Sequence, residues 1–203
     1  MRIIAGSARG RRITAPEGRG TRPMTDRARE STFNMLHSLG VLEGAVVLDL
    51  YAGSGSLGLE ALSRGAARVT FVEADRRAAA ALGHNVSHLG FEQQADVRVG
   101  PVAAVLPTLG PADLVFCDPP YAQDPWPGLL AAVPAPLVVA HTEADLDAPP
   151  GWEVLRRRRY GRAAITILQR DGGDTARQHG GDTARQHGGD AAEGNHQQHP
   201  SPS

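Results

Sequence analysis

The sequence predicts an α/β fold with a seven-stranded, mostly parallel sheet that carries helices on both faces. Between residues 46 and 140, short apolar runs alternate with helix-forming segments, and a glycine-rich turn directly follows the first run. Two further β-prone segments stand next to each other near residues 153–169. Alternation of this kind requires crossover helices that bury a parallel sheet, whereas the last two segments are expected to close one edge as an antiparallel hairpin.

The individual elements follow from residue type and turn signals. Strands are expected where Val, Leu and Phe are concentrated in short runs, and helices where a glycine ends a helical segment. The expected helices are 57–64 before Gly65 and 75–88 before Gly90, and the expected strands are 46–50, 68–72, 95–99, 114–117, 137–140, 153–160 and 163–169.

The first 40 residues are expected to form a small extension on this fold. Segments 2–4 and 12–14 are β-prone and are separated by glycines, which suits a hairpin lined by arginines. Thr25 is a suitable N-cap for an amphipathic helix that ends near Gly40. The polar positions of this helix that are expected to face solvent or substrate are Arg27, Arg29 and Glu30.

Basic residues are concentrated at the N-terminus. Residues 1–29 contain eight arginines and two acidic residues, although the whole chain carries a net charge of −1. Guanidinium groups bind phosphate in bidentate fashion and stack on bases, so this concentration favours a polyanionic partner. A solvated arm without a partner is the alternative.

The last 33 residues differ in composition from the rest of the chain. The octet Gly-Gly-Asp-Thr-Ala-Arg-Gln-His occurs at 172–179 and again at 180–187, with no apolar residues able to offset the entropy of ordering. Disorder is therefore expected there. The chain is expected to comprise an N-terminal extension (1–40), a catalytic core (41–170) and a low-complexity tail (171–203).

Cysteine and apolar content favour a cytoplasmic location. Cys117 is the only cysteine, so no intramolecular disulfide can form, and no segment resembles a secretory signal. The longest apolar run, 129–140, is interrupted by Pro134 and Pro136 and is too short to span a membrane. No membrane association is expected.

A nucleotide-type loop follows the first strand. Gly53, Gly55 and Gly58 form a G-x-G-x-x-G pattern, Asp49 precedes it on the strand, and Glu73 lies 20 residues beyond Gly53. Glycines allow positive φ and let a ligand approach the backbone, and the carboxylate of Glu73 suits two ribose hydroxyls. This spacing fits both a dinucleotide cofactor and S-adenosylmethionine.

A second motif, Asp118-Pro119-Pro120-Tyr121, directly follows the strand 114–117. The Asp118 carboxylate and the Pro119 carbonyl are suited to accept the two N–H bonds of an aromatic amino group, turning its lone pair toward a methyl donor. Tyr121 can stack on a base drawn out of its helix or loop. Together with the glycine loop, this motif favours methylation of a base amino group.

The sequence resembles the RsmD-like family of small-subunit (16S) ribosomal RNA guanine-N2 methyltransferases over about residues 2–170. The resemblance rests on segments 2–6 and 22–30, Asp49 with the glycine loop, Glu73, and the motif at 118–121. It implies a class I, Rossmann-like methyltransferase that uses S-adenosylmethionine and acts, as a monomer without metal, on 16S RNA within the small subunit or an assembly intermediate. The choice of guanine comes from the family alone.

The resemblance also implies roles for particular residues. Two residues depart from the family pattern: Met24 stands where the family often has a small hydroxyl residue, and Pro101 stands near the position of an acidic or amide side chain that often contacts the adenine of the cofactor. Asp96 or the backbone alone is therefore expected to make the adenine contact. The implied catalytic residues are Asp118, Pro119, Pro120 and Tyr121; the implied cofactor contacts are Asp49, Tyr51, Ala52, Gly53, Ser54, Gly55, Gly58, Glu73 and Ala74; the implied RNA contacts are Arg2, Arg9, Arg11, Arg12, Arg22, Thr25, Arg27 and Arg29.

Several other conspicuous residues are given structural roles. Arg156–Arg159 are expected on an edge strand, with alternate members on opposite faces. Cys117 is expected in the core, and Trp126 either walls the cleft or packs beneath the loop. Four histidines lack ligand spacing, and no metal site is expected: His37, His84, His88 and His141.

Three rival functions remain open at this stage. A DNA adenine-N6 methyltransferase would use the same Asp-Pro-Pro-Tyr motif, because the motif suits either amino group. A nicotinamide-dependent oxidoreductase would use the same glycine loop, and a non-catalytic ribosome-assembly factor would need only the basic extension.

Overall fold

The computed structural model describes residues 1–15, 25–120, 125–161 and 163–172. Arg22, Met24 and Tyr121 lie outside these ranges, as does nearly all of the tail, so the expectations for them stay predictions. Within the described ranges, no helix is long and apolar enough to cross a membrane.

The expected sheet is present, with seven strands in the order β3-β2-β1-β4-β5-β7-β6. The first five strands are parallel, β7 is antiparallel to β5, and β6 is antiparallel to β7 at the edge. The strands are β1 Val46–Leu50, β2 Arg68–Glu73, β3 Ala95–Val99, β4 Leu114–Cys117, β5 Leu137–Thr142, β6 Trp152–Tyr160 and β7 Ala163–Arg170. Each lies within two residues of its predicted bounds.

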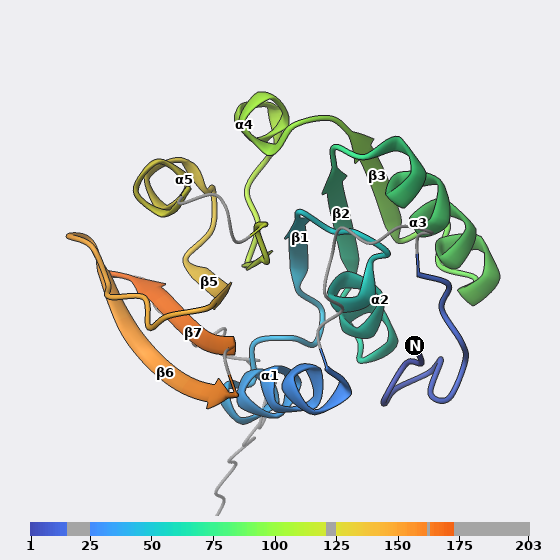
Figure 1. Ribbon diagram of the computed structural model, residues 1–203, viewed down its shortest axis with the longest axis horizontal. Coiled ribbons are helices and arrows are strands. Elements are labelled where there is room, and N and C mark those ends of the chain that lie inside the picture. The colour runs from blue at the N-terminus through green and yellow to red at the C-terminus, as the bar shows by residue number, and fades with distance from the viewer. Residues whose placement is uncertain (16–24, 121–124, 162, 173–203) are drawn as a thin grey trace, which may run out of the picture.

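Helices cover both faces of the sheet (Figure 1). One apolar cluster joins α1, α2 and α3 to one face, through residues such as Phe33, Leu59 and Leu82. A second cluster joins α4 and α5 to the other face, where Trp126 and Leu129 pack. The helices are α1 Asp26–Leu39, α2 Ser56–Ser63, α3 Arg76–Leu89, α4 Val102–Val105, which continues as a 3-10 turn at Leu106–Thr108, and α5 Trp126–Ala132.

Helix α1 begins and ends where the sequence predicts. The Thr25 side chain accepts a hydrogen bond from the Ala28 amide, which satisfies one free donor of the first turn. Gly40 adopts φ 66° and its amide donates to carbonyls of the last turn. Phe33 is fully buried and its ring centroid lies 5.6 Å from that of Phe116, so α1 is fixed directly on β4.

The first 14 residues form a hairpin-like turn with a single bridge, Arg2 to Arg12, in place of two full strands. Ile3 and Ile13 are buried in the same apolar cluster as α1 and α2. The N-terminal hairpin, residues 1–14, is therefore docked on the core and shares its packing.

Candidate active site

The glycine loop and the Asp-Pro-Pro motif leave the sheet side by side. β1 and β4 are neighbouring parallel strands in which Leu50 lies opposite Cys117. Tyr51 and Asp118 are the next residues, so the two loops start at the same level of the carboxyl edge. Ligands of open α/β sheets bind at this edge, which makes the space between the two loops the candidate active site.

The glycine loop is a tight turn with several positive φ angles. Tyr51 has φ 61°, a conformation that side chains rarely adopt, and Gly53 and Gly55 have φ 56° and 81°. The Gly55 amide donates to the Ala52 carbonyl at 2.8 Å, which closes the turn before α2. A Cβ on Gly53 would meet no described residue within 4 Å, so the described part of the chain leaves this side of the loop free for a ligand.

Gly58 is required by packing at the start of α2. A Cβ there would lie 2.3 Å from the Phe71 ring of β2, so only glycine permits this approach of helix and strand. The Gly58 amide donates to an Asp49 carboxylate oxygen at 2.8 Å. Asp49 therefore fixes the end of the glycine loop to the buried strand β1. Its contact with a cofactor stays a prediction.

Glu73 connects the ends of the glycine loop and of β2. One of its oxygens accepts the Gly53 amide and the other accepts the Asp75 amide, each at 2.7 Å. Asp75, not Glu73, is the N-cap of α3. A carboxylate has further lone pairs, so Glu73 keeps acceptor capacity for two ribose hydroxyls. Its exposed neighbour Ala74 lies at the same edge.

Carboxylates crowd the candidate active site. Burial, together with the nearby charges of Asp118 and Glu73, raises the pKa of Asp49 to about 8. Burial also raises the pKa of Asp118 to about 6. The site therefore disfavours a further anion and favours a cation. In the described part of the chain, no group of three metal-ligating side chains forms a metal site.

The second loop is described as far as Pro120. Pro119 is buried and Pro120 is exposed. Cys117 is fully buried, which confirms its expected place in the core, and this burial raises the pKa of its thiol. Trp126 is also buried among apolar side chains of the second cluster, so it packs in the core.

Asp96 does not lie at the carboxyl edge. It sits opposite Thr70, three residues before the end of β3, and its carboxylate is 2.8 Å from the Arg98 guanidinium. The structure therefore does not place Asp96 for the expected contact with adenine. At the edge itself, the Gly100 amide donates to the Glu73 carbonyl at 2.9 Å, so the backbone before Pro101 borders the site.

Sequence reasoning overlooked the residues that fix the N-terminal hairpin to the core. The Glu60 carboxylate of α2 is fully buried and accepts the amides of Ile4 and Ala5 at 2.7 and 3.0 Å. Farther along the hairpin, Ala8 donates to the Ser63 hydroxyl. A lone acid inside the apolar helix 56–63 was the available signal, because a buried carboxylate needs donors.

Arg29 belongs to the same buried cluster. The expectation that it faces solvent or substrate is wrong, because its side chain is 0 % exposed. Its guanidinium donates to the Arg2 carbonyl and to Asp26, and it lies 3.9 Å from the Glu60 carboxylate. Arg29, which was predicted to contact RNA, instead joins α1 to the hairpin and to α2.

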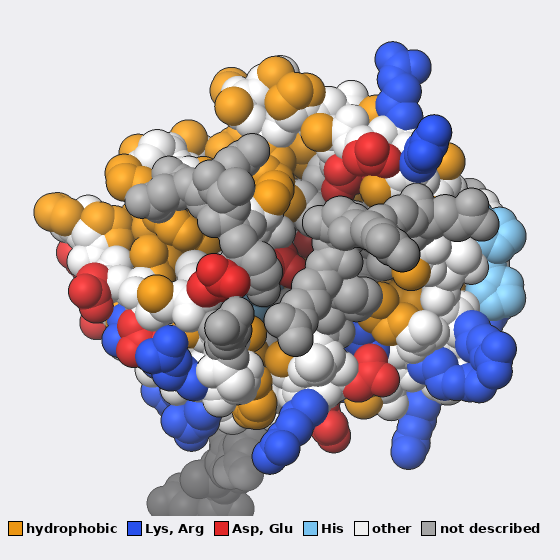
Figure 2. Space-filling view, in the orientation of Figure 1, with side chains coloured by type: hydrophobic (Ala, Val, Ile, Leu, Met, Phe, Trp, Pro, Cys, Tyr) orange, Lys and Arg blue, Asp and Glu red, His pale blue; other side chains and the backbone are white. Residues whose placement is uncertain are grey.

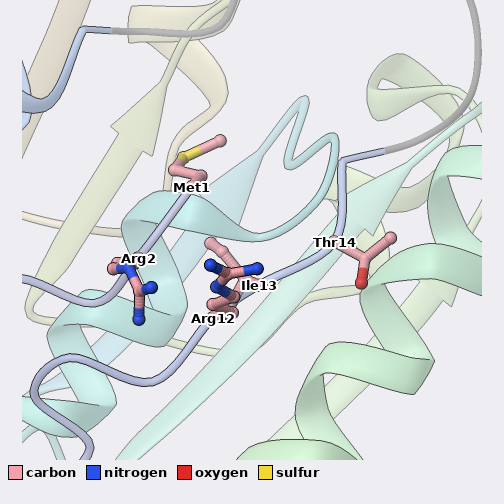
Figure 3. Close-up of a pocket in the computed structure, with 5 residues that line it drawn as sticks. All are labelled: Met1, Arg2, Arg12, Ile13 and Thr14. Carbon is pink, nitrogen blue, oxygen red and sulfur yellow. The ribbon is translucent and has the colours of Figure 1, made fainter.

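The remaining arginines of the hairpin divide into two groups. Arg11 donates to the Leu89 carbonyl at 3.0 Å and to the His88 carbonyl, so it caps the C-terminal end of α3. All three of Arg9, Arg11 and Arg12 are exposed, but the side chains of Arg9 and Arg12 make no hydrogen bond within the described residues. Arg2 and Arg12 line a pocket of about 390 Å³ with three neighbours, all shown in Figure 3: Met1, Ile13 and Thr14.

Other arginines lie on α1 and on the edge strand β6. The Arg27 guanidinium lies over the Tyr160 ring, 5.9 Å from its centroid. Arg157 and Arg159 of the edge strand β6 form ion pairs with Asp145, which precedes that strand. The edge position predicted for Arg156–Arg159 is confirmed. Figure 2 shows basic side chains projecting around the rim of this face, with acidic ones both at the rim and nearer its centre.

Known proteins are similar to this chain over most of its length. The family described as conserved hypothetical protein 95 matches residues 1–169. The chain is 35% identical over 185 residues to ribosomal RNA small subunit methyltransferase D of Escherichia coli (strain K12), covering 84% of this chain and 90% of that protein.

Two solved structures share the fold at similar identity. The yhhF protein from Escherichia coli superposes with a TM-score of 0.75 at 35% identity, covering 84% of this chain and 97% of that one. The Thermus thermophilus protein TTHA0928 gives a TM-score of 0.72 at 34% identity, covering 83% of this chain and 99% of that one.

Proposed function

Given that the chain belongs to the ribosomal RNA small subunit methyltransferase D family, we propose that it methylates the exocyclic N2 amino group of a guanine in 16S ribosomal RNA. The methyl donor is S-adenosylmethionine. The substrate is the RNA within the small subunit or an assembly intermediate, and the protein acts as a monomer. Family membership supports methyl transfer to ribosomal RNA, and the choice of guanine N2 is the finer part of the proposal.

The negative charge of the candidate active site is the observation that favours S-adenosylmethionine as the cofactor. Asp49, Glu73 and Asp118 interact closely enough to raise the pKa of Asp49. A dinucleotide would bring the two negative charges of a pyrophosphate to these carboxylates, whereas S-adenosylmethionine brings a sulfonium cation. Coulomb attraction therefore favours the second cofactor, which the glycine pattern alone does not distinguish from the first.

The residues of the glycine loop fit this cofactor. No described residue fills the space beside Gly53, and Glu73 retains lone pairs for the ribose hydroxyls. The backbone of Tyr51, Ala52, Ser54 and Gly55 shapes the turn. When bound, S-adenosylmethionine supplies a methyl group on a positively charged sulfur that is already reactive toward nucleophiles.

The second loop orients the acceptor. The Asp118 carboxylate and the Pro119 carbonyl accept the two N–H bonds of the amino group, which directs the nitrogen lone pair toward the donor and stabilises the developing charge. Asp118 has a pKa of about 6, so it is mostly ionised at neutral pH and able to accept. Tyr121 stacks on the extruded base.

Incubation with labelled S-adenosylmethionine tests the proposal. Three substrates are compared: naked 16S RNA, assembled small subunits and duplex DNA, each followed by nucleoside analysis. Label in N2-methylguanosine of RNA is expected. Label in N6-methyladenine of DNA, tighter binding of NADH than of S-adenosylmethionine, or RNA binding without transfer would each contradict the proposal in favour of a different function.

A further inference from the structure

His141 is a buried histidine beside the candidate active site that methyl transfer, as derived above, does not use. Ala140 of β5 lies opposite Cys117 of β4 in the parallel register, so His141 follows at the same level as Asp118. Phe116 and Val139 face α1 and α2, and alternation along β5 turns His141 to that face as well. His141 thus lies one strand away from the loop that holds the amino group.

Helix α1 fixes the tautomer of His141. The Thr32 hydroxyl donates its single proton to the Ala28 carbonyl at 3.0 Å. It can therefore only accept in its 3.3 Å contact with Nε2 of His141, so Nε2 carries the ring proton. Burial lowers the pKa of His141 to about 3, which keeps the ring neutral, and Nδ1 is then a bare acceptor.

That acceptor has no partner in the described part of the chain. His141 is 5% exposed, and Nδ1 is a buried atom without a hydrogen bond. Buried polar atoms are nearly always satisfied, so an orphaned acceptor next to an active site calls for a donor that arrives with a ligand. The neighbouring loop is suited to hold an aromatic amino group, which restricts the ligand to a base.

The three amino-bearing bases differ in the atom next to the amino carbon. In guanine, the amino group stands beside the N1–H donor. In adenine and cytosine, it stands beside a ring nitrogen that accepts. A fixed acceptor next to the amino site would pair with guanine and would face a second lone pair in the other two bases.

We propose that Nδ1 of His141 accepts the N1–H of the target guanine while Asp118 and Pro119 hold its amino group. His141 is then a specificity-determining residue, oriented by Thr32 of α1. The proposal rests on the proposed function, and it gives a physical reason for guanine that the Asp-Pro-Pro motif cannot supply, because that motif contacts the amino group alone.

Two substitutions of His141 separate its two nitrogens. In His141→Gln, the longer amide can still donate to Thr32 but places no acceptor at the position of Nδ1. In His141→Asn, the amide oxygen lies near the position of Nδ1, whereas the bond to Thr32 is lost. Comparable melting temperatures for the two variants show that both are folded.

The test pairs these variants with an altered substrate. In small-subunit RNA, the target guanine, once mapped, is replaced by 2-aminopurine, which keeps the amino group but has an unprotonated N1. The measured quantity is the ratio of kcat/KM on the guanine substrate to that on the 2-aminopurine substrate. Because 2-aminopurine also lacks O6, only the change of this ratio between proteins is informative.

The unaltered protein is expected to prefer guanine, and His141→Gln is expected to reduce that preference by about tenfold or more, with the loss confined to the guanine substrate. His141→Asn is expected to retain most of the preference. Equal losses on both substrates would indicate a purely structural role and overturn the proposal, as would an unchanged ratio in His141→Gln. If nucleoside analysis finds the methyl group on another base, the proposed function itself fails, and it fails before any variant is compared.

Discussion

The carboxyl edge of the sheet and the N-terminal hairpin each concentrate charge of one sign, but they hold it differently. At the edge, Asp49 and Glu73 bond to backbone amides of the glycine loop, so the fold fixes the acids that border the site. In and beside the hairpin, the exposed Arg11 and the buried Arg29 bind backbone carbonyls of neighbouring elements, while the exposed side chains of Arg9 and Arg12 make no such bond within the described residues. A cluster of charged residues in a sequence therefore indicates a binding surface only when the side chains that bond within the fold itself are left out of the count.

The largest effect is expected at the acidic edge. Asp118→Ala should lower turnover by about 100-fold or more, because the amino group loses a charged acceptor in the transition state. Binding of S-adenosylmethionine, measured by calorimetry, should persist. The matched control is Asp96→Ala, which removes an acid from β3 away from the site and should leave turnover near that of the parent. Normal turnover in Asp118→Ala would refute the assigned role.

The next effect concerns stability and separates structural from exposed arginines. Arg29→Met should lower the free energy of unfolding by about 3 kcal/mol, because the buried Glu60 loses a positive neighbour and the Arg2 carbonyl loses its donor. Urea denaturation followed by circular dichroism measures this. Arg12→Met, on the exposed hairpin, should change it by less than about 0.5 kcal/mol. Equal effects of the two substitutions would contradict the assignment of a structural role to Arg29 but not to Arg12.

A smaller effect is expected on the pH dependence of cofactor affinity at the acidic edge. Asp49 and Asp118 have raised pKa values of about 8 and about 6, and a bound cation favours their ionised forms. Affinity for S-adenosylmethionine should therefore rise as pH increases from 6 to 8.5, by up to about tenfold per pH unit for each proton released on binding. S-adenosylhomocysteine, whose sulfur is uncharged, serves as the matched ligand and should show a weaker dependence. Identical pH profiles for the two ligands would argue against the electrostatic basis of cofactor choice.

The smallest effect is expected on RNA binding. Removing Arg12 should weaken binding and reduce the slope of log affinity against log salt by about one unit per lost phosphate contact. Arg9→Ala should behave alike, since Arg9 is also exposed. Arg11→Ala should instead expose the carbonyls at the end of α3 and act mainly on stability. Filter binding at several salt concentrations distinguishes these outcomes, and a salt slope unaffected by the loss of Arg12 would exclude it from the RNA contact.

The sequence predicted the sheet and the positions of both loops because their signals are local. Apolar runs mark β1 and β4, and the glycines and Asp118 follow them directly, so register alone brings the motifs together. The burial of Arg29 was missed although Arg29, Phe33 and Leu36 share one face of α1 at helical spacing. A charge at such a position is normally assigned to solvent, and its partner Glu60 is distant in the sequence.

His141 was missed for a related reason. Its neighbours in sequence identify a buried strand, but the contact with Thr32 spans 109 residues and depends on how α1 packs across β4 and β5. Nothing in the residues around either partner indicates this contact. Long-range pairs of polar side chains of this kind are visible only once the fold places them together.

Gly6 sets the spacing between the two charged regions. A Cβ at Gly6 would lie 1.7 Å from the Ser63 carbonyl oxygen, so the hairpin rests against the last turn of α2, whose first turn carries the glycine loop. The eight residues of α2 span about 12 Å along the helix axis, so α2 holds the hairpin and the glycine loop at a fixed distance from each other. On the proposed function, an RNA strand bound at the hairpin has to reach a methyl donor bound at the glycine loop, and the length of α2 then sets how many nucleotides separate the bound segment from the modified base.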